Sequence, residues 1–216
     1  MRRHFEVELK EIQQELLRMG GMAENMLRDA VDSVLNRDGE LASVVIQSDD
    51  QVNTLENEIE ESCIRFIARH QPAASDLRLL SMVFKINHDV ERMADKAVNV
   101  AQRSLELLEY PPVKPFIDLP RVATIVRDMA KDALDAFVNR DANLAEAVRE
   151  RDEQVDEIYK QTVQELLIRL SEDSALVRPG ISILLLFRHL ERIGDLASNI
   201  SEEVYYLVKG DVLRHT

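Results

Sequence analysis

The chain has 216 residues, of which 45% are hydrophobic, 5% are aromatic and 31% are charged, and its formal net charge is −13. The negative charge is spread along the chain and argues against nucleic acid as a partner, because proteins that bind phosphate backbones gather Lys and Arg on one surface. No apolar run approaches the roughly 18 to 20 residues that cross a bilayer, so we expect no direct insertion into a membrane. The single cysteine, Cys63, fits a reducing cytoplasm, and we expect it to be an ordinary buried side chain.

Six long helices are predicted, because glycine and proline are sparse and the apolar residues repeat at helical spacing. Helices of about thirty residues are about 45 Å long, which suits antiparallel bundles with short turns. Asp38 and Asp141 are predicted to cap the second and fifth helices, and Gly20-Gly21 is a candidate kink in the first. In chain order, the predicted helices cover residues 4–36, 38–69, 75–109, 120–140, 142–170 and 179–208.

The chain contains an internal duplication. The motif Glu-Arg-x-x-Asp-x-x-x-Asn occupies residues 91–99 and again 191–199, an offset of 100 residues. The segments 36–42 and 49–52 recur with an offset of 103, so the second copy has lost three residues between these segments and the motif. Four of the six prolines lie between residues 110 and 120 and indicate a linker. The predicted fold is all-α, with two pseudo-symmetric three-helix bundles at residues 1–110 and 120–216 and a proline-rich linker at 111–119.

An apolar ladder in the sixth predicted helix defines the side of the helix that packs. Its residues alternate at spacings of four and three from Leu186 to Leu207, and nearly the same series begins at Ile86 in the third helix. Relative to this ladder, Glu191 and Asp195 point away from the packed side. We therefore expect the acidic residues of both motifs on the outer face of the bundles.

Each acidic motif has a partner with the same spacing on the preceding helix. Residues four apart lie about 6 Å from each other on one helix face, so two such pairs on adjacent helices form a cluster of oxygen ligands. Such a cluster suits Mg²⁺, Mn²⁺ or oxidised iron, and the lack of nitrogen and sulfur ligands argues against zinc. The predicted ligands are Glu91, Asp95, Asn99, Asp49 and Asn53 in the first half and Glu191, Asp195, Asn199, Asp152 and Asp156 in the second.

Two histidines lie close to the motifs in sequence. His88 and His189 do not occupy equivalent positions in the two copies. We expect each of them to be a surface or capping residue rather than a metal ligand.

Other interpretations of the acidic residues remain open. Outward-facing carboxylates are commonly solvated surface. Repetition of the same polar residues in both halves, while their apolar neighbours differ, favours a function instead. No nucleophile elbow, phosphate-binding glycine loop or cysteine pair is present, so we expect no enzyme. The alternatives are a metal-dependent phosphate-ester hydrolase and a helical adaptor whose acidic residues bind no metal.

With its two Glu-Arg-x-x-Asp-x-x-x-Asn motifs in a duplicated helical chain, the sequence resembles the PhoU family, the accessory and regulatory proteins of the bacterial phosphate-specific transport system. This resemblance implies a pair of three-helix bundles with metal ions at surface acidic motifs. It further implies a cytoplasmic negative regulator of phosphate uptake and of the phosphate-starvation response. The implied partners are a sensor histidine kinase and the ATPase subunit of the phosphate ABC transporter, and a homodimer is the expected assembly. Asn53 stands where the second half has Asp156, so the first site is expected to have one charge fewer.

Overall fold

The computed structural model describes residues 2–112 and 119–209, which form six long α-helices and no strand. The all-α prediction is confirmed, and the helix ends differ from the predicted ones by at most two residues. Within the described ranges, no helix combines the length and the apolar character that crossing a bilayer requires. The helices are α1 (Arg2–Asn36), α2 (Gly39–His70), α3 (Ala74–Leu108), α4 (Leu119–Asn139), α5 (Ala142–Glu172) and α6 (Val177–Lys209), with a 3₁₀ turn at Ser174–Leu176 before α6.

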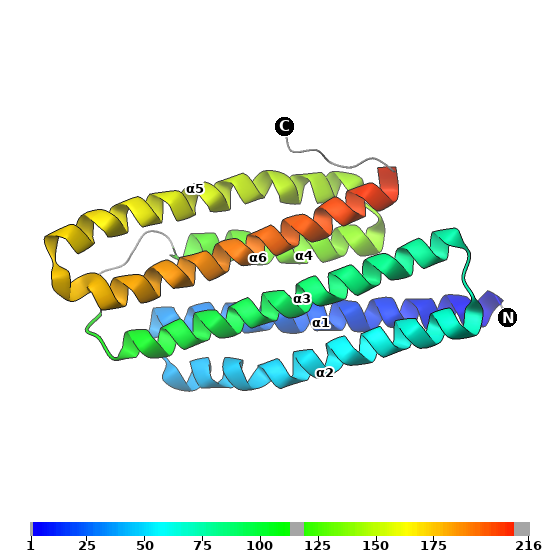
Figure 1. Ribbon diagram of the computed structural model, residues 1–216, viewed down its shortest axis with the longest axis horizontal. Coiled ribbons are helices and arrows are strands. Elements are labelled where there is room, and N and C mark those ends of the chain that lie inside the picture. The colour runs from blue at the N-terminus through cyan, green and yellow to red at the C-terminus, as the bar shows by residue number, and fades with distance from the viewer. Residues whose placement is uncertain (1, 113–118, 210–216) are drawn as a thin grey trace.

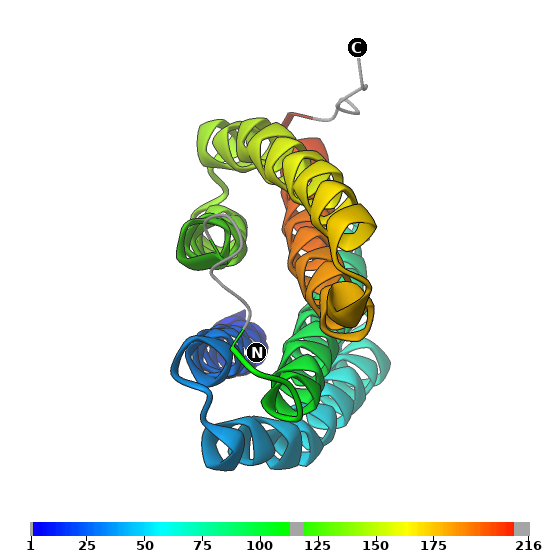
Figure 2. The ribbon, with the colours of Figure 1, turned by 90° about the vertical axis from the view of Figure 1, so that its left-hand side faces the viewer.

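The six helices lie roughly along one common axis and form an elongated body (Figure 1). The end-on view shows α1, α2 and α3 as one group and α4, α5 and α6 as the other, with α2 and α5 at the two extremes (Figure 2). The groups meet where α3 contacts α6 and α1 contacts α4. These groups correspond to the predicted halves, and most of the predicted linker, residues 113–118, lies outside the described residues.

The apolar ladder packs at the centre of the body. Leu186 and Leu190 of α6 are buried, as are Ile86 and Val90 at the corresponding positions of α3. Cys63 is also buried, as predicted, and this burial raises the pKa of its thiol to about 12. These equivalent apolar residues lie on α3 and α6, two helices that contact each other between the halves, as α1 and α4 also do.

Two turns show that the duplication extends to local backbone geometry. Asp38 and Asp141 cap α2 and α5 with nearly identical dihedral angles (φ −99°, ψ 97° and φ −97°, ψ 98°). The Asp38 carboxylate accepts a hydrogen bond from the backbone N–H of Leu41, and that of Asp141 accepts from those of Asn143 and Leu144. The preceding residues, Arg37 and Arg140, both adopt the left-handed conformation, with φ of 54° and 52°. The two predicted caps are confirmed.

Gly20 lies where the two halves approach closely. The helix α1 is continuous through Gly20 and Gly21. A Cβ atom on Gly20 would lie 2.1 Å from Cδ1 of Leu134 in α4, whereas a Cβ atom on Gly21 would have nothing within 4 Å. The lack of a side chain at Gly20 thus serves the contact between α1 and α4.

Candidate metal centres

In the second half, the acidic residues gather between α5 and α6. Asp156, Glu191 and Asp195 each offer a carboxylate oxygen, and the three oxygens lie within 4.8 Å of one another. Glu191 is only 8% exposed, so the predicted outward orientation is wrong for this residue. The reason is that α6 packs against α3, α4 and α5 together, and the helix face beside the apolar ladder is covered by α5.

Asp152 experiences the strongest effect of this crowding. Its pKa is raised from the ordinary 3.8 to about 6, first by burial and then by the neighbouring charges of Asp195 and Asp156, against a hydrogen bond with Ser198 that lowers it. A Cβ atom on Gly194 would lie 3.3 Å from Oδ1 of Asp152, so the glycine allows α5 to approach α6 at this point. Burial and mutual repulsion of these carboxylates therefore disfavour their charged forms, and a bound cation would relieve both effects.

Two arginines partly compensate the negative charge of the second half. Arg188 donates a hydrogen bond to Oε1 of Glu191, and its guanidinium carbon lies 5.6 Å from the centre of the Tyr159 ring. Arg192 donates to Oδ2 of Asp195 at 2.6 Å. Oε2 of Glu191 is nevertheless buried without a hydrogen-bond partner in the described part of the chain, and burial together with Asp195 raises the pKa of Glu191.

In the first half, the predicted residues lie at the corresponding contact between α2 and α3. Asn53 donates from Nδ2 to Oδ2 of Asp49 at 3.0 Å, while Oδ1 of Asp49 is buried and has no hydrogen-bond partner among the described residues. Burial raises the pKa of Asp49, and the charge of Asp95 adds to the shift. Burial also raises the pKa of Glu91, followed by the charges of Asp95 and Glu56.

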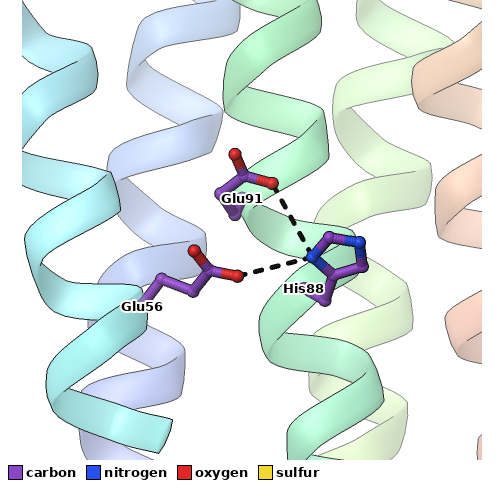
Figure 3. A group of neighbouring side chains, drawn as sticks. All are labelled: Glu56, His88 and Glu91. Atoms are coloured by element: carbon purple, nitrogen blue, oxygen red, sulfur yellow. Dashed lines mark hydrogen bonds and ion pairs between the residues drawn. The ribbon is translucent and has the colours of Figure 1, made fainter.

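The first half adds two residues that were not predicted as ligands. Glu56 and His88 form a close group with Glu91, in which one potential ligand atom from each lies within 4.8 Å of the others (Figure 3). Nδ1 of His88 lies 3.4 Å from Oε1 of Glu56 and 3.9 Å from Oε2 of Glu91. The His88 side chain is 64% exposed, as expected of a surface residue, yet its ring faces two carboxylates. Sequence reasoning missed Glu56, although its position seven residues after Asp49 places both on one face of α2.

The other predicted residues have different surroundings. Asn99 donates from Nδ2 to the backbone oxygen of Asp95 at 2.6 Å, and Asn199 is exposed. His189 is half-buried, and its pKa is lowered by burial and then by the charges of Lys96 and Arg103 on α3. His189 therefore faces the other half of the molecule. Metal ligation by Asn99 and Asn199 stays a prediction.

The donor atoms at both contacts fit a hard cation. Carboxylate oxygens are the ligands that Mg²⁺, Mn²⁺ and oxidised iron prefer. Among the described residues Oε2 of Glu191 has no hydrogen-bond partner, and Nε of Arg192 lies 3.9 Å from it; buried acceptors of this kind are rare in native proteins unless water or an ion satisfies them. Asp152 and Asp156 from α5 and Glu191 and Asp195 from α6 would hold the ion in the second half.

Comparison with known proteins agrees with this architecture. The family described as the PhoU domain matches residues 16–104 and 119–204, one match in each half. The phosphate-specific transport system accessory protein PhoU homolog of Pseudomonas putida is 42% identical over 98% of this chain and 83% of its own length, and the PhoU protein of Escherichia coli is 36% identical over 98% and 88%. The crystal structure of PhoU from Pseudomonas aeruginosa superposes with a TM-score of 0.92 at 41% identity, covering 96% of this chain and all of that one. The chain therefore belongs to the PhoU family.

Proposed function

We propose that this protein is an accessory regulator of phosphate-specific transport that restrains phosphate uptake and the phosphate-starvation response when phosphate is plentiful. The observation that supports this most is similarity over almost the whole chain to proteins named for that system. In this proposal the protein acts in the cytoplasm as a homodimer. It docks on the ATPase subunit of the phosphate transporter and on a sensor histidine kinase.

The proposal includes cations at the two acidic contacts. In each half, carboxylates from two helices are crowded into a partly buried space, and the pKa values of Asp49, Glu91, Asp152 and Glu191 are all raised, with burial as the largest cause. A bound cation would neutralise these groups and fix α2 against α3 and α5 against α6. The function proposed for the cations is to shape the surface on which the partner proteins dock.

The docking proposal is tested by co-purification. Tagged protein is recovered from cells grown at high and at low phosphate, and the captured proteins are identified by mass spectrometry. The transporter ATPase subunit and the sensor kinase should be enriched in a phosphate-dependent manner. Recovery of neither partner at either phosphate concentration would contradict the proposal.

The part played by the acidic contacts is tested with Asp95→Ala combined with Asp195→Ala. The double variant should keep its helicity but derepress a phosphate-starvation reporter in phosphate-rich medium, because it weakens the cation site in both halves. Asp50→Ala combined with Glu153→Ala is a matched control, since it removes two charges from exposed positions of α2 and α5. If both double variants repress like the wild type, the acidic contacts have no regulatory function.

Cation binding itself is tested by elemental analysis and by calorimetric titration of chelator-treated protein with Mn²⁺ or Mg²⁺. At a free concentration of about a hundred times the Kd, the ion should stabilise the fold by about 2.7 kcal/mol. The gain should be much smaller in the variant that lacks Asp95 and Asp195. A phosphatase assay of the same samples with these ions distinguishes the proposed regulator from a metal-dependent hydrolase. The regulator should show no turnover.

A further inference from the structure

The strongest unexplained feature is the group formed by Glu56, His88 and Glu91. Glu56 and His88 lie outside the paired acidic residues of the two motifs, and only Glu91 is shared with them. Nδ1 of His88 faces both carboxylates from one side, 3.4 Å from Oε1 of Glu56 and 3.9 Å from Oε2 of Glu91 (Figure 3). This arrangement brings an imidazole nitrogen to a centre that otherwise offers oxygen alone.

The distances suit one ion bound by all three side chains. Tetrahedral zinc binds nitrogen and oxygen ligands at about 2.0 to 2.2 Å, so neighbouring ligand atoms lie roughly 3.3 to 3.5 Å apart. The two separations measured from Nδ1 of His88 are already close to this value, and the two carboxylates are within 4.8 Å of each other. Small rotations of side chains on the protein surface would complete the geometry.

Two buried side-chain oxygens on the same pair of helices, α2 and α3, also have no hydrogen-bond partner among the described residues. The side chain of Asn87 is almost fully buried and donates from Nδ2 to the backbone oxygen of Glu56 at 2.9 Å, whereas its Oδ1 has no partner in the described part of the chain. Oδ1 of Asp49, whose charge affects Glu91, is in the same situation. Unsatisfied buried acceptors are costly, and a hydrated cation supplies the missing donors or positive charge.

The second half shows what the same position looks like without such a group. Tyr159 and Arg188 occupy the positions equivalent to Glu56 and His88, and they contact each other by a cation–π interaction. Arg188 donates to Glu191, and its guanidinium stays protonated and has no free nitrogen lone pair, so it cannot ligate an ion as His88 can.

We propose that Glu56, His88 and Glu91 form a site for a divalent transition ion that accepts nitrogen, of which Zn²⁺ is the probe, and that this site exists in the first half alone. Imidazole suits zinc and other late transition ions, whereas Mg²⁺ and Mn²⁺ favour oxygen ligands. The inference rests on the proposed cation binding only through the shared residue Glu91. Such a zinc site would make the two halves selective for different ions.

The test uses full-length protein freed of metal by chelation. Zn²⁺ is titrated by calorimetry, Co²⁺ absorption in the visible range reports direct nitrogen and oxygen ligation, and Mn²⁺ is titrated in parallel. His88→Ala and Glu56→Gln should each lower the apparent zinc affinity of one site by about tenfold or more. Mn²⁺ affinity should change less than about twofold, because the oxygen ligands of the motifs remain.

His189→Ala is the matched control, because His189 lies at the corresponding stretch of α6 and the charges that lower its pKa are those of Lys96 and Arg103. This control should bind Zn²⁺ like the wild type, and circular dichroism should show all variants to be equally helical. The proposal is overturned if the wild type binds no Zn²⁺, if His88→Ala leaves zinc binding unchanged, or if it reduces Mn²⁺ binding to the same extent. If the wild-type protein binds Zn²⁺ as expected but does not bind Mn²⁺, that result counts against the proposed function and not against this zinc site.

Discussion

The two halves of the molecule share one scaffold but surround their acidic residues differently. In the second half, Arg188 and Arg192 contact Glu191 and Asp195. In the first half, the residue equivalent to Arg192 is Arg92, which pairs with Asp89 at 3.4 Å instead. At this place the first half therefore has an imidazole facing its carboxylates, and the second half has two guanidinium groups.

This difference shows which parts of a duplicated site can change separately. The apolar ladder and the helix caps keep their places because they determine how the helices meet. The residues around the acidic pairs can exchange an imidazole for a guanidinium without altering that packing, since both lie at the edge of the contact. A duplicated fold can thus keep two similar acidic contacts while giving them different neighbouring side chains.

The largest effect is expected where the halves are alike. Leu190→Ala should destabilise the protein by about 2 to 5 kcal/mol, because it leaves a cavity at a fully buried position. Val90→Ala, the equivalent change in the first half, should cost roughly 1 to 3 kcal/mol because fewer methyl groups are lost. Denaturant unfolding of metal-free protein measures both. A negligible effect at either position would mean that the two ladders are not equivalent parts of the core.

An intermediate effect is expected where the halves differ in charge. Because folding raises the pKa of Asp152 from 3.8 to about 6, its contribution to stability is present below pH 3.8 and is lost as the pH rises through 6. Asp152→Asn should therefore stabilise the metal-free protein at pH 7 by on the order of 1 kcal/mol once solvent screening is allowed for. The gain should shrink as the pH falls toward 4.

The matched change in the first half is Asp49→Asn. Burial raises the pKa of Asp49 as well, but this carboxylate accepts a hydrogen bond from Asn53 where Asp152 has the charged Asp156 as its neighbour. Its stabilising effect at pH 7 should accordingly be smaller. Thermal melts between pH 4 and pH 7 compare the two variants, and an equal gain from both would show that the acidic contacts are electrostatically alike.

The smallest effect is expected from Gly194→Ala, which gives the second half the alanine that the first half has at Ala94. Alanine favours a helix over glycine by roughly 0.5 to 1 kcal/mol, but the new Cβ atom would lie 3.3 Å from Oδ1 of Asp152. These effects oppose each other, so the net change in stability should be below about 0.5 kcal/mol. Mn²⁺ affinity should fall because Asp152 is displaced. Unchanged affinity would show that the close approach at Gly194 does not serve the site.

The sequence by itself determined the fold class, the helices and the pairing of acidic residues. Helical periodicity, two aspartate caps and the repeated motif were enough to place the six helices to within two residues. These features are local or repeat along the chain, so the amino-acid sequence alone reveals them. The same spacing argument brought Asp156, Glu191 and Asp195 together correctly.

Only the tertiary structure decided which way these residues face and what else joins them. One apolar ladder defines one packed side, but α6 contacts three other long helices, so Glu191 is buried where the ladder predicted exposure. Glu56 and His88 lie on different helices, and their contact depends on how α2 is placed against α3 (Figure 3). Burial and contacts between helices are properties of the packed bundle, because they depend on every neighbour of a helix and not on its own periodicity.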